Sequence, residues 1–208
     1  MEAVLLNHMG TDLDVVNAAR VSFAKRHNEF VPEKDGKLIR YLAKHNHWTP
    51  FGHAVAKFYV KAPIFVARQL VKHQVGLVWN EVSRRYIDDA PEFWWPEEWR
   101  LRAENVKQGS SFSTIKYSKE ACEKFEKDAC QLYQDMLNKG IAPEQARIVL
   151  PVNMYTEWHW TGSLAAWARV CKLRLDSHAQ AETRKIALQI SRQMHELFPV
   201  SWQALMVS

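Results

Sequence analysis

The sequence predicts a single α+β domain over residues 1–208, in which several helices pack on a small, mainly antiparallel sheet. The length of 208 residues suits one domain with a sizeable core. A few short segments have the alternating pattern of strands, and long stretches with helical spacing separate them. Because the strands do not alternate regularly with helices, this order favours α+β over a doubly wound fold.

The first part of the chain predicts a strand and two helices. Residues 3–8 form a short apolar run that opens the fold as a strand. Thr11 or Asp12 can cap the first helix, and Asp35 can cap the second. Helical spacing predicts that each helix buries one face, formed by Leu13, Val16, Ala19 and Phe23 in the first and by Leu38, Ile39 and Leu42 in the second.

A second strand and a third helix follow. Strict alternation over residues 53–62 predicts a strand with one apolar face, formed by Ala54, Ala56, Phe58 and Val60. Pro63 suits the first turn of the next helix, and Gly76 marks its end. The inward residues of this helix are Ile64, Ala67, Leu70 and Val71. Residues 90–111 are rich in aromatic residues and predict an irregular excursion.

Helices predominate in the second half. Residues 118–138 predict a helix that ends before Gly140, with an inward stripe of Ala121, Phe125, Ala129, Leu132, Tyr133 and Met136. Pro143 and Pro151 bound a short helix. Alternation then predicts a strand whose one side carries Val152, Met154, Thr156, Trp158 and Trp160. Ser163 can cap a helix that runs to Leu173. A last helix runs from about Ser177 to Leu197, with Ile186, Ile190, Met194 and Leu197 inward.

Composition narrows the class of protein. The net charge of +5 favours anionic partners such as phosphates or nucleic acid, although on composition alone a mildly basic surface is the better explanation. The three cysteines are widely spaced, which predicts no disulfide framework and favours a reducing compartment, the cytoplasm. No signal peptide and no membrane-spanning run is evident. Nine tryptophans suggest a large core, a subunit interface or a stacking pocket.

Several common sites are missing from the sequence. It contains neither GxxxxGK[ST] nor GxGxxG, the two frequent phosphate-binding turns. With only seven glycines, phosphate would have to be held by Arg and Lys side chains. The segment "HNHWTPFGH" clusters His45, His47 and His53, but their spacing matches no standard zinc pattern, and we predict no metal site.

A dense set of hydrogen-bonding groups directly follows the apolar segment "APIFVARQLV". In residues 80–86, "NEVSRRY", strand-like alternation places Glu81, Ser83 and Arg85 on one face. A bound nucleotide needs such a set, because Arg can hold phosphate while a hydroxyl and a carboxylate orient the rest. The alternative is an edge strand with an exposed ladder of salt bridges.

Two further segments place cations beside apolar residues. Arg147 precedes the apolar run of "ARIVLPVNMYTEWHW". In "LRLDSHAQ", the cluster of Arg174, Asp176, Ser177 and His178 lies at the junction of two predicted helices. Asp176 or Ser177 can serve as a helix cap, whereas Arg174 and His178 have no such structural role.

The segment "ARQLVKHQVGLVWNEVSRRY" resembles the signature of the flavin-dependent thymidylate synthases, the ThyX family. That signature has an Arg-His-Arg triplet and, further on, a serine within Asn-Glu-x-Ser-x-Arg-Tyr. The resemblance extends to "HWTPFGHAVAKFYVKAPIFVARQ" and to "ARIVLPVNMYTEWHWTGSLAAW" and "LRLDSHAQAE", and it is weakest over residues 90–140. The chain departs from the family at Lys72 and Gln74, which replace the two arginines, and at Ser163, Ala165 and Arg169.

The resemblance implies an enzyme that methylates dUMP to dTMP. The carbon donor would be 5,10-methylenetetrahydrofolate, and FAD reduced by NADPH would supply the hydride. It also implies a homotetramer with active sites between subunits, and no membrane association. The implied dUMP site comprises Gln69, Lys72, Glu81, Ser83, Arg84, Arg85, Arg147 and Arg174. The implied FAD site comprises Thr49, Lys72, His73, Gln74, Glu81, Ser163, Arg169 and His178.

The chemistry of the implied reaction suggests roles for two of these residues. A fixed guanidinium beside N3 of uracil would stabilise the N3-deprotonated ring, which makes C5 more nucleophilic, and we assign this catalytic role to Arg174. Ser83 has no neighbouring base that would activate it as a nucleophile, so we interpret it as a dUMP-binding residue.

Two alternatives remain open at the level of sequence. A nucleic-acid-binding module would explain the basic charge and the interleaved segment "WWPEEWRLR". However, Lys and Arg are spread along the whole chain, with no basic tail. A flavin- and folate-dependent methyltransferase that acts on another uridine acceptor would share the same chemistry.

Overall fold

The computed structural model describes residues 1–87, 89–104 and 109–208, and its centre is a four-stranded antiparallel sheet. The strands lie in the order β1-β2-β6-β3, and their bounds are Glu2–Met9, Val55–Pro63, Tyr155–Ser163 and Leu77–Glu81. A separate two-stranded ribbon pairs β4 with β5, at Trp99–Arg100 and Thr114–Ile115. The prediction of an α+β chain with a small antiparallel sheet is confirmed.

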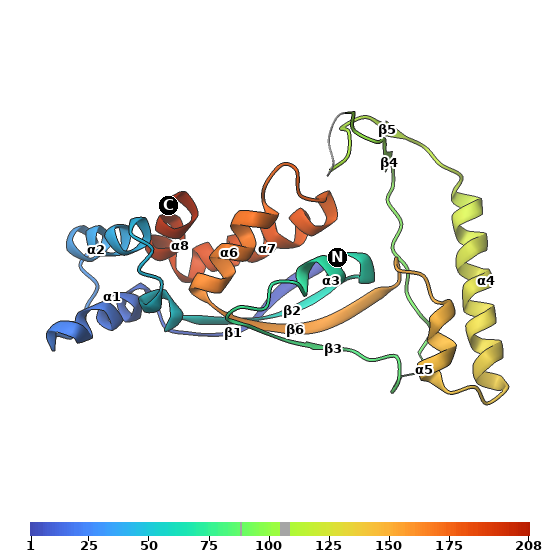
Figure 1. Ribbon diagram of the computed structural model, residues 1–208, viewed down its shortest axis with the longest axis horizontal. Helices are drawn as coiled ribbons and strands as arrows, with labels where there is room; N and C mark the ends of the chain where they lie inside the picture. Colours follow the sequence, from blue (N-terminus) through green and yellow to red (C-terminus); the bar gives the residue numbers. More distant parts are fainter. Residues whose placement is uncertain (88, 105–108) are drawn as a thin grey trace.

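Helices cover one face of the sheet and extend beyond both of its ends (Figure 1). Their bounds are α1 Asp12–Arg20, α2 Pro32–Lys44, α3 Ile64–Leu70, α4 Lys119–Asn138, α5 Pro143–Ala146, α6 Leu164–Arg174, α7 Ala181–Leu197 and α8 Pro199–Val207. Three short 3-10 helices are η1 Val21–Phe23, η2 Thr49–Gly52 and η3 Arg147–Val149. Helices α3, α6 and α7 lie over the sheet, whereas α4 and α5 stand at one end of the molecule (Figure 1).

The two central strands, β2 and β6, make the floor of the core because their side chains alternate strictly. In β2 the residues Ala56, Phe58, Val60 and Ala62 are fully buried. They lie opposite Gly162, Trp160, Trp158 and Thr156 of β6 in the antiparallel register. The face predicted for β2 is therefore confirmed, as is the burial of Thr156, Trp158 and Trp160 on β6. Val152, predicted on the same face, lies outside β6 and is 46% exposed. Apolar burial of the shared face supplies the main driving force for packing the helices.

Tryptophans fill much of the space between sheet and helices. The ring of Trp167, on α6, lies edge-on to Phe58 at 5.0 Å and to Trp160 at 4.8 Å. On the edge strand, Trp79 stacks on Trp158 with ring centroids 4.3 Å apart. At least part of the tryptophan surplus therefore belongs to the core.

Edge strand β3 approaches β6 closely at one glycine. A Cβ atom at Gly162 would lie 2.3 Å from Cδ2 of Leu77, which is far inside van der Waals contact. A larger residue at this position would displace the side chain of Leu77 and would crowd the backbone oxygen of Gly76, which lies 3.2 Å from the added Cβ atom. Gly162 therefore provides room for Leu77 at the start of β3, the strand that carries Glu81.

Three predicted helix boundaries are wrong. Helix α2 begins at Pro32 rather than after Asp35, which instead lies fully buried and forms an ion pair with Arg20 at 2.5 Å. Helix α1 ends before Phe23, whose side chain is 74% exposed rather than inward. Helix α7 begins at Ala181 rather than near Ser177.

The end of α3, the buried face of α4 and the last helix of the chain also differ from the prediction. Helix α3 ends at Leu70, and Gly76 lies further on, immediately before β3. On α4, Ala129 and Tyr133 are buried as predicted, but Phe125 and Leu132 are each 50% exposed. Helix α8 was not predicted. The irregular character of residues 90–111 is confirmed apart from the two-residue strand β4, and residues 105–108 lie outside the described residues.

No helix in the described ranges combines the length and the apolar character that crossing a membrane requires.

Candidate active site

A cavity of about 700 Å³ opens where strands β3 and β6 reach the end of the sheet near α5. We call it the sheet-end cavity. Its lining comes from β2, α3, β3, α5, η3 and β6 and from the segments after β3 and before β6. The lining residues are Lys61, Ile64, Arg68, Glu81, Val82, Arg84, Ile87, Asp89, Ala90, Glu92, Glu144, Arg147, Ile148, Leu150, Val152, Met154, Tyr155, Thr156 and Glu157. Its volume suits a nucleotide-sized ligand.

The carboxylate of Glu81 is held in a fixed orientation at the cavity wall. Glu81 is the last residue of β3 and pairs with Trp158 of β6. Its Oε1 accepts a hydrogen bond from Oγ1 of Thr156 at 2.7 Å, and its Oε2 accepts one from Nε1 of Trp79 at 3.1 Å. Because both partners sit on the sheet, this acceptor is preorganised for a ligand rather than mobile.

Three guanidinium groups line the same cavity, from Arg68, Arg84 and Arg147. Arg84 donates to the backbone oxygen of Asp89, and Nε of Arg147 donates to the backbone oxygen of Glu144 at 3.2 Å. Within the described ranges, none of the three forms an ion pair with a carboxylate. They are therefore available to hold an anion such as phosphate, which Arg binds through paired donors.

The lysine of the cavity has a different role. Nζ of Lys61 lies 2.5 Å from Oε2 of Glu92 and 3.6 Å from Oε1 of Glu157. The hydrogen bond with Glu92, more than any other contact, raises the pKa of Lys61 above its usual range. This cation is already neutralised by the protein, which leaves the arginines as the free positive charges.

The strand predicted over residues 80–86 ends early, and this changes which side chains meet. After Glu81 the chain turns, and both N and Nε of Arg85 donate to Oγ of Ser83, at 3.3 and 3.2 Å. Arg84, rather than Ser83 and Arg85, joins Glu81 at the cavity wall. The alternation that placed Glu81, Ser83 and Arg85 on one face is therefore wrong.

A second group of predicted residues lies between α3, α6 and α7, and we call it the helix-side group. It comprises Gln69, His73 and Arg174, none of which lines the sheet-end cavity. The side chain of Gln69 contacts that of Gln180 and accepts a hydrogen bond from Oγ1 of Thr183 at 3.2 Å. Nε of Arg174 donates to Nε2 of His73 at 2.8 Å.

The contact with Arg174 fixes the protonation state of His73. Nε2 accepts a hydrogen bond, so it carries no proton, and the imidazole is neutral. Burial lowers the pKa of His73 below its ordinary value of 6.5, and the positive charges of Arg174 and Arg169 lower it further. With Nε bound to His73, the terminal nitrogens of Arg174 have no hydrogen-bond or ion-pair partner among the residues that the structure describes and can meet a ligand.

His73 should therefore titrate at an unusually low pH. Its pKa is lower in the folded than in the unfolded state, so its contribution to stability is complete above pH 6.5 and is lost as the pH falls through the folded pKa. An NMR titration of the His73 ring protons in the parent and in Arg174→Ala would test this. We expect a pKa below 6.5 in the parent and a higher pKa in the variant. A parent value at or above 6.5 would contradict the geometry.

The loop of residues 72–76 is tied to helix α6, beside several predicted flavin ligands. Gly76 has a φ of +74°, and a Cβ atom there would lie 3.2 Å from Cβ of Ala166 and 3.4 Å from Oγ of Ser163. Nη2 of Arg169 donates to the backbone oxygen of Val75 at 2.6 Å. Ser163 caps α6 as predicted, since its Oγ accepts from the backbone N–H of Ala166 at 3.3 Å.

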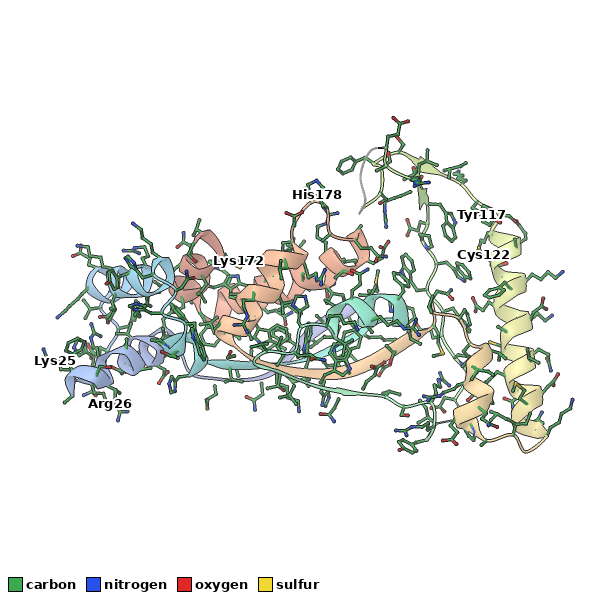
Figure 2. The ribbon with its side chains drawn as sticks, in the orientation of Figure 1. Lys25, Arg26, Tyr117, Cys122, Lys172 and His178 are labelled. Carbon is green, nitrogen blue, oxygen red and sulfur yellow. The ribbon has the colours of Figure 1, made fainter. Side chains whose placement is uncertain are left out.

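The remaining predicted flavin ligands are more dispersed. Lys72 and Gln74 are exposed in the loop, and Thr49 is exposed at the start of η2. Figure 2 shows His178 at the outer turn between α6 and α7, where its ring Nδ1 lies 3.0 Å from Oδ1 of Asp176. Hydrogen bonds from the backbone N–H of His178 and then from its ring lower the pKa of Asp176.

Sequence reasoning missed several residues of the cavity, including Arg68, Lys61 and Thr156. Arg68 directly precedes Gln69 within the segment that carries the motif, and this position was the available signal. Thr156 reaches Glu81 only because β3 pairs with β6. Lys61 lies beside Glu157 at the cavity only because β2 pairs with β6. Such contacts depend on strand register, which spacing within one segment does not reveal.

A family model and curated relatives match this chain over nearly its whole length. The family model described as thymidylate synthase complementing protein matches residues 4–200. A flavin-dependent thymidylate synthase of Kosmotoga olearia is 40% identical over 210 residues, which cover 97% of this chain and 88% of the relative. One of Thermus thermophilus is 41% identical over 201 residues, which cover 96% of this chain and 73% of the relative.

A solved structure is similar over nearly the whole chain. The UMP/dUMP methylase PolB from Streptomyces cacaoi, bound with 5-Br dUMP, superposes with a TM-score of 0.85 and 32% identity, covering 99% of this chain and 94% of that one. The same protein bound with 5-Br UMP gives a TM-score of 0.84.

Proposed function

Because this chain belongs to the flavin-dependent thymidylate synthase family, we propose that the sheet-end cavity and the helix-side group together bind dUMP for its conversion to dTMP. The observation that carries this proposal is the pairing of a fixed carboxylate, Glu81, with guanidinium groups that have no carboxylate partner among the described residues. A nucleoside monophosphate presents the complementary set, an anion at one end and hydrogen-bond donors at the other.

Within the cavity, arginines bind the phosphate and the sheet orients the rest of the nucleotide. Arg84 and Arg147 supply charge, and Arg68 adds a third guanidinium at the same wall. Ser83 and Arg85 contact each other in the turn after β3 and do not line the cavity. We propose both as further dUMP ligands from the family motif, without a nucleophilic role for the hydroxyl. Lys72 and Gln69 complete the set of dUMP ligands.

The division of the site residues supports a homotetramer in which one subunit completes the site of another. Gln69 and Arg174 do not line the cavity that contains Glu81 and Arg147. The sheet-end cavity of one chain would therefore bind the phosphate of dUMP but would lack Arg174, the group proposed to stabilise the N3-deprotonated uracil ring. Closed assemblies bring different patches of identical chains together, and the half-exposed Phe125 and Leu132 on α4 offer apolar surface for such contacts.

The loop of residues 72–76 with α6 fits a flavin dinucleotide. Gly76 leaves a narrow space beside Ala166 and Ser163 that a Cβ atom would fill, and Lys72 and Arg169 place cations there for a pyrophosphate. His73, Gln74, Thr49, Glu81, Ser163 and His178 are the other FAD ligands of this proposal. When bound, the FAD supplies the hydride, which NADPH replenishes, and 5,10-methylenetetrahydrofolate supplies the carbon.

Arg174 is the residue that activates the uracil ring. Loss of the N3 proton places negative charge on the ring and makes C5 a better nucleophile. The terminal nitrogens of Arg174 stabilise this charge, while the neutral His73 occupies its Nε and fixes the direction of the guanidinium. Because the guanidinium of Arg174 is already oriented, the protein does not have to reorganise as negative charge develops on the uracil ring.

The visible absorption spectrum of the purified protein tests this proposal. With FAD added, we expect a bound flavin spectrum that shifts when dUMP is added, because both ligands share one site. If the protein binds no flavin, or if dUMP leaves the bound flavin spectrum unchanged, the proposed site is wrong.

A second acceptor, UMP, is favoured by one observation. The similar protein PolB is described as a UMP/dUMP methylase. Titrating UMP and dUMP separately against the flavin spectrum, and then measuring NADPH-dependent methylation of each, distinguishes a deoxyribonucleotide enzyme from one that also accepts ribonucleotides.

A further inference from the structure

A second cavity, of about 270 Å³, lies between the aromatic segment of residues 93–100 and the start of α7. It shares no lining residue with the sheet-end cavity. We call it the tryptophan cavity, because its walls include the rings of Trp94, Trp95, Trp99 and Phe65. The proposed reaction gives this segment of the chain no role.

The walls of the tryptophan cavity are anchored on both sides. The backbone N–H of Trp94 donates to the backbone oxygen of Asn153 at 2.9 Å, and Nδ2 of Asn153 donates back to the oxygen of Trp94 at 3.0 Å. Nε1 of Trp95 donates to Oε2 of Glu126, on α4, at 3.0 Å. The ring of Trp94 packs on Phe65 at 5.5 Å, and that of Trp95 on Trp99 at 6.1 Å. The cavity is therefore a built feature with flat aromatic surfaces.

A buried carboxylate at the wall lacks one hydrogen-bond partner. Glu182, in the first turn of α7, is only 5% exposed. Its Oε1 accepts from Nη2 of Arg100 at 2.6 Å, whereas its Oε2 has no hydrogen-bond partner within the described part of the chain. Leaving a buried carboxylate oxygen without a donor is unfavourable, so the site is set to accept an N–H group.

We propose that the tryptophan cavity binds an amino-substituted heteroaromatic ring. The ring stacks against the tryptophans, and its amino group donates to Oε2 of Glu182. Since Arg100 already neutralises much of the charge of Glu182, a neutral amino group is a better match than a second cation. The volume lies just below that of whole-ligand pockets, so the ring enters and the rest of the ligand stays outside.

The position of the cavity links it to the helix-side group. Gln180 lines the tryptophan cavity and also contacts Gln69. Three compounds in the proposed reaction carry a ring of the required chemistry. NADPH and FAD each carry an adenine, and the folate carries a pterin. The choice of these probes rests on the proposed function, but the geometry of the cavity does not.

Binding of AMP and of folic acid, each measured by calorimetry and by quenching of tryptophan fluorescence, tests the proposal. AMP represents the adenine source and folic acid the pterin source, and purine riboside monophosphate, which lacks the amino group, is the control for AMP. We expect one of the two probes to bind, and Glu182→Gln to weaken it about tenfold or more, because the amide presents N–H groups to the amino group. The matched control Glu97→Gln, exposed and outside the cavity, should bind like the parent.

A second variant guards against a folding defect in Glu182→Gln. Ser110 is exposed and lines the cavity, so Ser110→Trp should fill it and abolish binding without altering the core. The proposal is overturned if neither probe binds, if both variants bind like the parent, or if purine riboside monophosphate binds as tightly as AMP when AMP is the ligand. The effect of dUMP on the flavin spectrum, measured in the same variants, reports separately on the proposed function.

Discussion

Replacing Arg174 with alanine is expected to lower the rate of dUMP methylation by about 100- to 1,000-fold, the usual cost of removing one preorganised donor at a developing charge. The guanidinium is held by Nε on His73, with its terminal nitrogens directed elsewhere. Without it, nothing in the helix-side group stabilises the N3-deprotonated ring. Single-turnover measurement of dTMP formation, with flavin already bound and reduced, isolates this step from reduction by NADPH.

Flavin and dUMP binding provide the control for Arg174→Ala. The variant should still give the flavin spectrum, because Arg169 continues to tie the loop of residues 72–76 to α6 after the contact between Arg174 and His73 is lost. Normal methylation by the variant would show that Arg174 is not the ring-activating group. Loss of flavin together with activity would assign it to the cofactor site.

Mixing two inactive variants tests whether the site spans subunits. Arg174→Ala and Glu81→Gln each remove one part of the proposed site, and within a single chain only Glu81 of these two residues lines the sheet-end cavity. If one subunit completes the site of another, assemblies that contain both variants should regain part of the activity, because some sites then have both native residues. If mixed subunits that have been dissociated and reassembled stay inactive, both parts belong to the same chain.

Arg20→Ala should be the most destabilising of the changes considered, at about 3–5 kcal/mol, because it leaves the carboxylate of Asp35 buried without its partner. The pair lies at 2.5 Å between α1 and α2, and Asp35 is fully buried. For a chain of this size the melting temperature falls roughly 2–4 °C per kcal/mol, so thermal unfolding gives a large signal. Arg26→Ala is the matched control, since Arg26 is exposed at the end of the molecule (Figure 2).

The loss of stability in Arg20→Ala should shrink in acid. Burial alone would raise the pKa of Asp35, but hydrogen bonds from Arg20 and from the backbone N–H of Val31 outweigh it and hold the pKa below 3.8. The ion pair therefore contributes its full stability above that pH, and the contribution is lost as the pH falls through the lowered pKa. Urea unfolding of parent and variant at neutral pH and near pH 3 measures the difference. A gap that widens in acid would contradict this assignment.

Patterns among neighbouring residues were sufficient to predict strand faces from their two-residue alternation and helix ends from their capping residues. The alternating face of β2, the alternation of β6 from Thr156 onward, the cap at Ser163 and the turn at Gly140 all depend on neighbouring residues, and the structure confirms them. Asp35 has the chemistry of a helix cap, but a buried arginine from another helix changed its role. Residue type alone does not distinguish these two uses of a carboxylate.

The candidate site was less predictable because it depends on pairing between distant strands. The motif predicted Glu81 as a site residue, and Glu81 lines the sheet-end cavity. The partners that fix its carboxylate, Thr156 and Trp79, depend on the register of β3 against β6. Because the chain turns after Glu81, Arg84 lines the cavity, whereas Ser83 and Arg85, which were predicted there, contact each other instead. Strand alternation cannot anticipate where a strand ends.

The stacked indoles of Trp79 and Trp158 give the protein an intrinsic optical reporter. Their centroids lie 4.3 Å apart with an angle of 20° between the planes, so their electronic transitions couple. The hydrogen bond from Trp79 to Glu81 connects this coupled pair to the wall of the sheet-end cavity. A ligand that pulls on the carboxylate will change the overlap of the two rings, and near-ultraviolet circular dichroism can follow occupancy of the cavity without any added label.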